Sequence, residues 1–161
     1  MTVRNIRDGD IVRCLEIYNY YIEKTTVSFE EKPLSLGDFT ERVKKIAENY
    51  PFIVADDGEK TVGYAYLDRF HERSAYRYTA DLSIYLDRDC IAKGTGGLLL
   101  DEIERRGKSM GIKNVISLIT EENALSVAFH EKHGFRPVGR LEKVGVKFGR
   151  ALDVLYYQKA L

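Results

Sequence analysis

The chain has 161 residues, and its 25 basic and 25 acidic side chains give a formal net charge of zero. This balance gives no electrostatic reason to expect nucleic acid or an anionic membrane as a partner. No apolar segment approaches the ~20 residues of a membrane span, and Cys14 and Cys90 lack the spacing of a metal site or a disulfide framework. We therefore expect a single cytoplasmic domain over residues 1–161, with reduced thiols and no metal.

The first half of the chain predicts a strand, two helices and a β-hairpin. Ser35 and Asp38 form a capping-box-like pair at the start of the second helix. That helix ends before Pro51, because the residue before a proline resists the α region. The expected elements are a strand over 2–6, helices over 11–22 and from 35 to the proline, and strands over 52–55 and 61–67.

The second half alternates strands and helices. A glycine closes each helix, Gly111 the first and Gly134 the second. The expected elements are a strand over 76–86, a helix over 95–110, a strand over 115–119, a short helix from 122 or 123, and strands over 135–144 and 152–159 around a turn at 147–150. The whole order, β-α-α-β-β-β-α-β-α-β-β, predicts an α/β or α+β fold in which a mixed sheet carries helices on its faces.

A glycine-rich turn at residues 91–97 joins an alternating strand to a helix. Such a turn leaves backbone N–H groups without partners at the positive end of the helix dipole, which suits a phosphate or pyrophosphate. The turn lacks the Gly-Lys-Ser/Thr of a Walker A loop, and Leu99 stands where a dinucleotide fingerprint needs its third glycine. A tight connection with glycines for close packing is the alternative.

Four features in this order resemble the GNAT superfamily of N-acetyltransferases: the acidic strand, the glycine turn, a helical element and the final strand pair. The helical element, residues 123–135, is similar to the superfamily pattern Asn-x-x-Ser/Ala-x-x-x-Tyr/His-x-x-x-Gly-Phe. Residues 26–29, 73–81 and 145–154 resemble the phosphinothricin N-acetyltransferase family, which acetylates the amino group of phosphinothricin and, in many members, of methionine sulfoximine. The resemblance runs from about residue 6 to the C-terminus. It implies the GNAT fold, acetyl-CoA as co-substrate and a homodimer.

The chain departs from the family pattern near the acidic strand and the last turn. Asp81 replaces a glutamate, and Val146, Phe148 and Ala151 replace an aromatic residue, a histidine and a tryptophan. Acetyl transfer survives these changes at the family level, while the particular substrate does not follow from them.

The resemblance also implies a coenzyme site. The backbone of the strand before the turn pairs with the pantetheine amides as if with another strand, and the turn's amides hold the diphosphate. For Asn123, the implied contact is with the pantetheine arm, and its alternative role is to cap the helix. The implied residues are Ile84, Tyr85, Leu86, Ala92, Lys93, Gly94, Thr95, Gly96, Gly97 and Asn123.

Acetyl-CoA carries an activated thioester, so the amine can attack directly and no protein nucleophile is needed. A free amine is mostly protonated at neutral pH, and some group must accept its proton. The resemblance puts Asp81 in that role, and partial burial would raise its pKa from ~4 toward a useful value. The alternative is a solvated carboxylate, or an ion-pair partner for Arg73 or Arg77.

His130 stands where many GNAT proteins have a tyrosine that protonates the leaving thiolate. Histidine can donate a proton near neutral pH. The alternative is a half-exposed helix residue without a chemical role.

The expected substrate site provides aromatic surface and one cation. Arg73 would hold a substrate carboxylate through two parallel hydrogen bonds. The implied residues are Phe29, Arg73, Tyr76, Tyr78 and Tyr85. We expect acetylation of a small amino-acid-like amine. The alternatives are another amine (a polyamine, a peptide N-terminus or an antibiotic) and a non-catalytic acyl-CoA-binding regulator.

Overall fold

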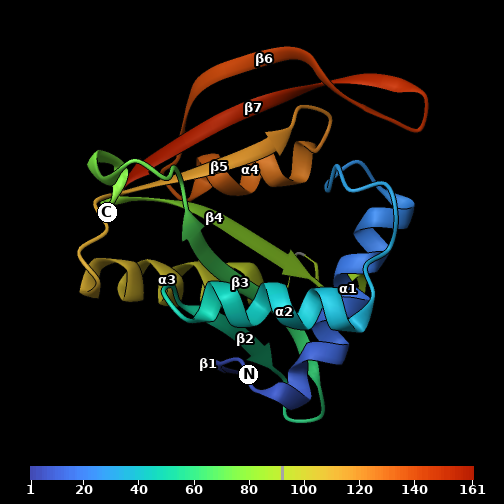
Figure 1. The fold of residues 1–161 in the computed structure, drawn as a ribbon, viewed down its shortest axis with the longest axis vertical. Coiled ribbons are helices and arrows are strands. Elements are labelled where there is room, and N and C mark those ends of the chain that lie inside the picture. The colour runs from blue at the N-terminus through green and yellow to red at the C-terminus, as the bar shows by residue number, and fades with distance from the viewer. Residues whose placement is uncertain (92) are drawn as a thin grey trace.

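The structure, a computed structural model, describes residues 1–91 and 93–161 (Figure 1). Its elements follow the predicted order. They are β1 (Thr2–Asn5), α1 (Ile11–Lys24), α2 (Leu36–Ala47), β2 (Phe52–Asp56), β3 (Thr61–Arg69), β4 (Thr79–Leu86), α3 (Thr95–Ser109), β5 (Asn114–Thr120), α4 (Ala124–Lys132), β6 (Arg136–Lys147) and β7 (Arg150–Ala160). In the described part of the chain, no helix is long and apolar enough to cross a membrane.

The seven strands form one mixed sheet in the order β1-β2-β3-β4-β5-β7-β6. β4 and β5 pair in parallel, and the other neighbours pair antiparallel. Parallel neighbours need a crossover connection, which α3 supplies. The prediction of a mixed sheet with helices on its faces is therefore confirmed.

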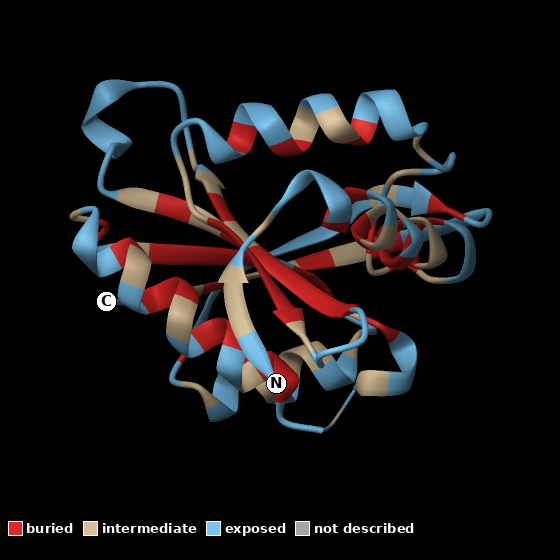
Figure 2. Cartoon of the chain, turned by 90° about the horizontal axis from the view of Figure 1, so that it is seen from below, coloured by how far each residue is buried: buried red, intermediate tan, exposed pale blue. Residues whose placement is uncertain are grey.

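Helices cover both faces of the sheet, so the central strands are buried on both sides (Figure 2). α1 and α2 pack on one face through an apolar cluster that includes Ile22, Phe39 and Tyr64. α3 packs on the other face through Leu99 and Ile103, and α4 joins the edge of that second cluster. Such double coverage explains why β2 and most of β3 are buried at successive positions and not only at alternate ones.

One predicted boundary is wrong in a way that matters for the site. The strand expected from residue 76 begins at Thr79, and Ser74–Tyr76 form a 3₁₀ turn. The N–H of Tyr76 donates to the carbonyl of Arg73 at 3.0 Å, so these backbone groups bond locally and not to a neighbouring strand.

The final hairpin is longer than predicted. β6 continues to Lys147, and β7 begins at Arg150. The turn therefore consists of Phe148 and Gly149, both with positive φ (52° and 71°). Two such residues form the turn type whose twist matches that of paired strands. Figure 1 shows this hairpin as a long, curved ribbon along the β5 edge of the sheet.

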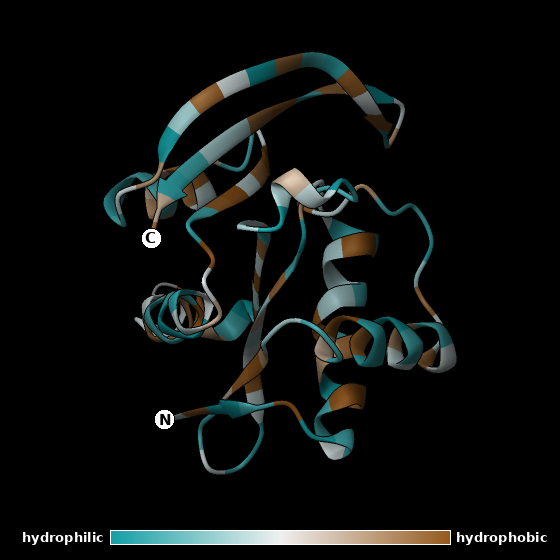
Figure 3. Cartoon of the chain, turned by 60° about the vertical axis from the view of Figure 1, so that its left-hand side comes forward, coloured by the Kyte–Doolittle hydropathy of each residue, from teal (hydrophilic) through white to brown (hydrophobic). Residues whose placement is uncertain are grey.

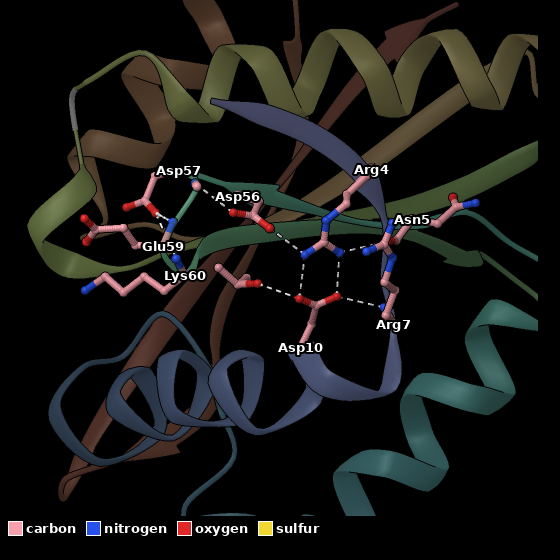
Figure 4. A network of polar contacts seen from close by, with 10 residues as sticks. Arg4, Asn5, Arg7, Asp10, Asp56, Asp57, Glu59 and Lys60 are labelled. Carbon is pink, nitrogen blue, oxygen red and sulfur yellow. Dashed lines mark hydrogen bonds and ion pairs between the residues drawn. The ribbon is translucent and has the colours of Figure 1, made fainter.

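A polar network fixes the start of α1 against the sheet (Figure 4). Arg4 donates to both oxygens of Asp10, at 2.7 and 2.9 Å, and to Asp56 at 2.6 Å. Asp10 also accepts from the N–H of Arg7 and the hydroxyl of Thr61. The bonds from Arg4 are the main reason why the pKa of Asp10 falls to about 2. The network ties β1, β2 and β3 to α1, the helix that forms one wall of the candidate site.

Candidate active site

β4 and β5 separate after a short paired stretch, and a cavity opens where they part. Their ladder covers the positions from Thr79 and Asn114 to Asp81 and Ile116. Beyond that point β4 stays paired with β3 and β5 stays paired with β7. The cavity has a volume of about 550 Å³, and its walls come from β4, β5, β7, α1 and the segment after α1.

Asp81 lies at the last paired position and lines this cavity. Its side chain is on the sheet face opposite Leu82 and Ile84, in agreement with the strand alternation. The Oδ1 atom is buried and has no hydrogen-bond partner among the described residues. Burial, and secondly the nearby carboxylate of Asp68, raise the pKa of Asp81 to about 7.

The alternative of an ion pair between Asp81 and Arg77 is wrong. The Arg77 side chain donates to the carbonyl of Ser74 at 3.0 Å and lies over the ring of Tyr78, 4.4 Å from its centroid. Arg73 is exposed and forms no ion pair with Asp81 in the described part of the chain. The Asp81 carboxyl therefore faces the cavity without a cation to hold it ionised.

Across the cavity, a hydrogen-bonded group joins α1 to the segment that follows it. The hydroxyl of Tyr18 donates to Glu30 and lies 3.1 Å from the hydroxyl of Ser28. Arg42 of α2 binds both oxygens of Glu30, at 2.7 and 3.0 Å, and this is the largest cause of the lowered pKa of Glu30. Asp81 and Glu30 are thus the two carboxyls of the cavity wall. No Lys, Arg or His belongs to that wall among the described residues.

The segment after α1 is held in place by the β6–β7 hairpin. Phe29, expected in the substrate site, lines the cavity and packs directly against Gly145, where a side chain would collide with its ring. Lys147 is buried and donates from Nζ to the carbonyl of Ser28 at 2.6 Å. These two contacts fix the rim of the cavity.

The remaining expected substrate residues divide into two groups. Tyr85 lines the cavity, and its ring packs between Tyr18 and Tyr64, with centroids 5.0 and 5.3 Å away. The others lie exposed on the connection between β3 and β4 and do not line the cavity, because the 3₁₀ turn replaces the first residues of the expected strand. They are Arg73, Tyr76 and Tyr78.

The glycine turn forms the N-terminus of α3, as expected. Gly94 is the N-cap residue, with φ at +87°, and no side chain caps this helix end. Ser35 and Asn123, by contrast, cap α2 and α4. A Cβ on Gly96 would lie 3.2 Å from the ring of Phe129, so a glycine lets α4 approach closely.

The turn fits a diphosphate on chemical grounds. The first-turn N–H groups of α3 have no intrahelical partner and point along the positive end of the helix dipole. Thr95, Gly96 and Gly97 supply these groups, and the exposed Lys93 precedes them. Ala92, also expected in this loop, lies outside the described residues.

Two further expected coenzyme contacts have other partners in the structure. The carbonyl of Leu86 accepts from the hydroxyl of Tyr21 at 2.6 Å. The side chain of Asn123 accepts from the N–H of Ser126 at 3.2 Å, which is the capping role considered as its alternative. From Leu82 to Leu86 the β4 edge facing β5 has no ladder partner in the described part of the sheet, and this edge fits an extended ligand.

His130 is a buried residue of α4, so the alternative of a half-exposed helix residue is wrong. Its ring packs against Phe135 and its Nδ1 lies 2.8 Å from the carbonyl of Ser126. A carbonyl only accepts, so in the neutral ring the proton sits on Nδ1. Burial is the largest cause of the lowered pKa of His130. His130 also does not line the cavity. Its expected role as proton donor to the thiolate stays a prediction, and this geometry does not favour it.

Sequence reasoning missed several residues of the cavity wall. Tyr18 lies in the helix predicted over 11–22, and Glu30 lies in the connection between the two predicted helices; neither is among the predicted site residues. The family resemblance of residues 26–29 was the signal that this segment belongs to the site. The other wall residues that the sequence did not predict are Val27, Ser28, Leu82, Ser83, Ile116, Leu118, Thr120 and Val154.

Comparisons with known proteins agree with this geometry. A family model described as an acetyltransferase (GNAT) domain matches residues 3–156. Phosphinothricin N-acetyltransferase of Alcaligenes faecalis is 35% identical over 99% of this chain and 82% of its own length. L-methionine sulfoximine/L-methionine sulfone acetyltransferase of Pseudomonas aeruginosa is 31% identical over 98% of this chain and 92% of its own.

A solved structure, the phosphinothricin acetyltransferase of Sinorhizobium meliloti in complex with acetyl-CoA, superposes with a TM-score of 0.95 at 34% identity. The alignment covers 99% of this chain and 88% of that one. The relatives span almost the whole of this chain, and one of them was crystallised with acetyl-CoA. The chain belongs to the GNAT family of acetyl-CoA-dependent N-acetyltransferases.

Proposed function

We propose that this enzyme acetylates the primary amine of a small amino-acid-like molecule, of the phosphinothricin or methionine sulfoximine type. The observation that carries the proposal is the Asp81 carboxyl, which faces the cavity at the point where β4 and β5 part. The names of the relatives support this substrate class. The free cysteines Cys14 and Cys90 support a cytoplasmic location.

Acetyl-CoA supplies an activated thioester, and the protein's task is to hold it and to take a proton from the amine. The α3 N-terminus and the open edge of β4 are the groups that would hold the coenzyme. Asp81 would accept the proton of an amine in the cavity, directly or through one water. Its pKa of about 7 suits this role, because a base works best when its pKa lies near the working pH.

The cavity wall also supports a second candidate, an amine without a carboxylate such as a polyamine. Two carboxyls line the cavity, and the expected cation, Arg73, lies outside it. Arg42 already neutralises Glu30, which weakens this candidate. For an amino acid, two cations contact residues of the wall from outside the cavity. Arg42 binds the carboxylate of Glu30, and Lys147 binds the carbonyl of Ser28.

Matched amines distinguish the two candidates. We expect L-methionine sulfoximine to be acetylated at least tenfold more efficiently than spermidine, and L-methionine more efficiently than 3-(methylthio)propylamine, which lacks only the carboxylate. Thiol release from acetyl-CoA measures kcat/KM for each amine. A preference for the decarboxylated amine would support the second candidate. Tight coenzyme binding without turnover of any amine would support a regulator.

Replacement of the proposed base tests the mechanism. Asp81→Asn removes the proton acceptor and keeps the shape, so we expect kcat to fall by well over tenfold, about the lower range for general base catalysis, with little change in affinity for CoA. Steady-state kinetics with the best amine and calorimetric titration with CoA measure the two effects. Unchanged turnover would put the proton acceptor elsewhere.

The same variant should be more stable than the wild-type protein at high pH. A carboxyl whose pKa is raised by folding stabilises the fold below its unfolded value of 3.8, and this contribution is lost as pH rises to about 7. Asp81→Asn avoids the loss. We expect a gain on the order of 1–3 kcal/mol at pH 8 after allowing for solvent screening, and almost none at pH 4. Urea unfolding at the two pH values measures it, and an equal gain at both would contradict the pKa assignment.

We also propose that the protein is a homodimer. β6 is an edge strand of 12 residues, and its apolar side chains alternate with polar ones along an exposed ribbon (Figure 3). Val144 and Val146 are 55% and 66% exposed. An edge of this length normally pairs or is covered. Light scattering after gel filtration should give a molar mass twice that of the chain. In Val146→Lys, the measured mass should shift toward that of the monomer. A monomeric wild-type protein would contradict the proposal.

A further inference from the structure

Asp68 and Asp81 occupy directly opposite positions on neighbouring antiparallel strands. The β3–β4 ladder pairs Asp68 with Asp81, and the pairs on either side are Leu67 with Leu82 and Arg69 with Ala80. Side chains at opposed positions project from the same face of a sheet, with Cβ atoms roughly 4.5–5.5 Å apart. Like charges at such a pair are unfavourable, so the arrangement disfavours two ionised carboxylates at once.

Solvent and local bonding distinguish the two carboxyls. Asp68 does not line the cavity, and its Oδ1 accepts from the N–H of Arg69 at 2.7 Å. Asp81 has a buried oxygen without a partner. Burial therefore disfavours the ionised form of Asp81.

The other groups that face Asp81 do not offset this effect. β3 also presents Tyr66, and β4 presents Ser83 and Tyr85. α1 and the segment after it present Tyr18 and Glu30, and Glu30 is paired with Arg42 of α2. β5 and β7 present uncharged side chains, Ile116, Leu118, Thr120 and Val154. Across the described part of the cavity wall, no cation opposes Asp68.

We propose that Asp68 is a positioning residue for Asp81: from the opposite strand, its carboxylate sets the pH at which Asp81 becomes able to take the proton of the amine. Asp68 does this without touching the substrate. The inference rests on the proposed function for its consequence in catalysis, and on the geometry of the free protein for the coupling itself. Asp68 is also the second cause of the raised pKa of Asp81, after burial.

The coupling is tested first without substrate. The side-chain carboxyl carbon of Asp81 is followed by NMR in protein labelled at aspartate, with the signal assigned from Asp81→Asn. We expect Asp68→Asn to lower the midpoint of this titration by roughly 0.5–1 pH unit, the size expected of one like charge at close range in partly screened surroundings. Asp68→Ser serves as a second neutral variant if Asp68→Asn folds poorly.

Two control variants test whether the shift comes from the charge at position 68. One changes the side-chain shape there and keeps the charge, and the other changes the net charge of the protein elsewhere. Asp68→Glu keeps the charge and should leave the midpoint near its wild-type value. Glu59→Gln removes one negative charge at the exposed β2–β3 turn, far along the strand from Asp81, and should also leave it unchanged. A shift in Glu59→Gln equal to that in Asp68→Asn would overturn the proposal, since any lost charge would then suffice.

Kinetics then connect the coupling to catalysis. The same amine is used for all variants, so that its own titration cancels. In Asp68→Asn, the acid limb of the plot of kcat/KM against pH should shift to lower pH by the same amount as the NMR midpoint. At pH 6 this variant should be about 3–5-fold faster than wild type, and at pH 9 equal or slower, because a weaker base accepts the proton less readily.

The outcomes separate this inference from the proposed function. If the enzyme is active and Asp68→Asn changes neither the NMR midpoint of Asp81 nor the acid limb of kcat/KM, the role of Asp68 is overturned and the proposed function stands. A shifted midpoint in a protein that acetylates no amine supports the coupling and overturns the proposed function.

Discussion

The separation of β4 from β5 is the constraint on which the site depends. Each strand keeps one complete ladder, β4 with β3 and β5 with β7, so the sheet stays continuous while two inner edges diverge beyond Asp81 and Ile116. Backbone groups on such edges need other partners, and an extended ligand is a suitable one. The same divergence opens the cavity beside Asp81. One feature of the sheet therefore creates both the open strand edge and the cavity to which the proposed function assigns the coenzyme and the amine.

The molecule treats its buried carboxyls in two opposite ways. Asp10 receives bonds from Arg4, Arg7 and Thr61, and its pKa falls to about 2. Asp81 receives none, and its pKa rises to about 7. The first arrangement stabilises the fold at neutral pH, whereas the second costs stability there. An unpaired buried carboxyl would be a defect in a purely structural position, and at the edge of a cavity it fits the proposed role of a base.

The particular residues explain why the sequence predicted the framework better than the site. Helices and strands followed from apolar spacing, and the caps at Ser35 and Asn123 followed from residue type. The cavity wall did not, because Tyr18 and Glu30 meet Asp81 only through the packing of α1 against β4. The expected cation Arg73 precedes the strand predicted from residue 76, and that strand begins only at Thr79, after a 3₁₀ turn at Ser74–Tyr76, so Arg73 does not line the cavity.

His130 shows a further difference between position and chemistry. The pattern in residues 123–135 correctly predicted a helix at this place, and a histidine there can carry a proton near neutral pH. The neighbours decide whether it does. In the neutral ring the Nδ1–H donates to the carbonyl of Ser126, and the ring packs against Phe135 and does not line the cavity, so this geometry does not favour His130 as a proton donor. Under the proposed function, solvent and the proposed base Asp81 are the other sources of a proton for the leaving thiolate.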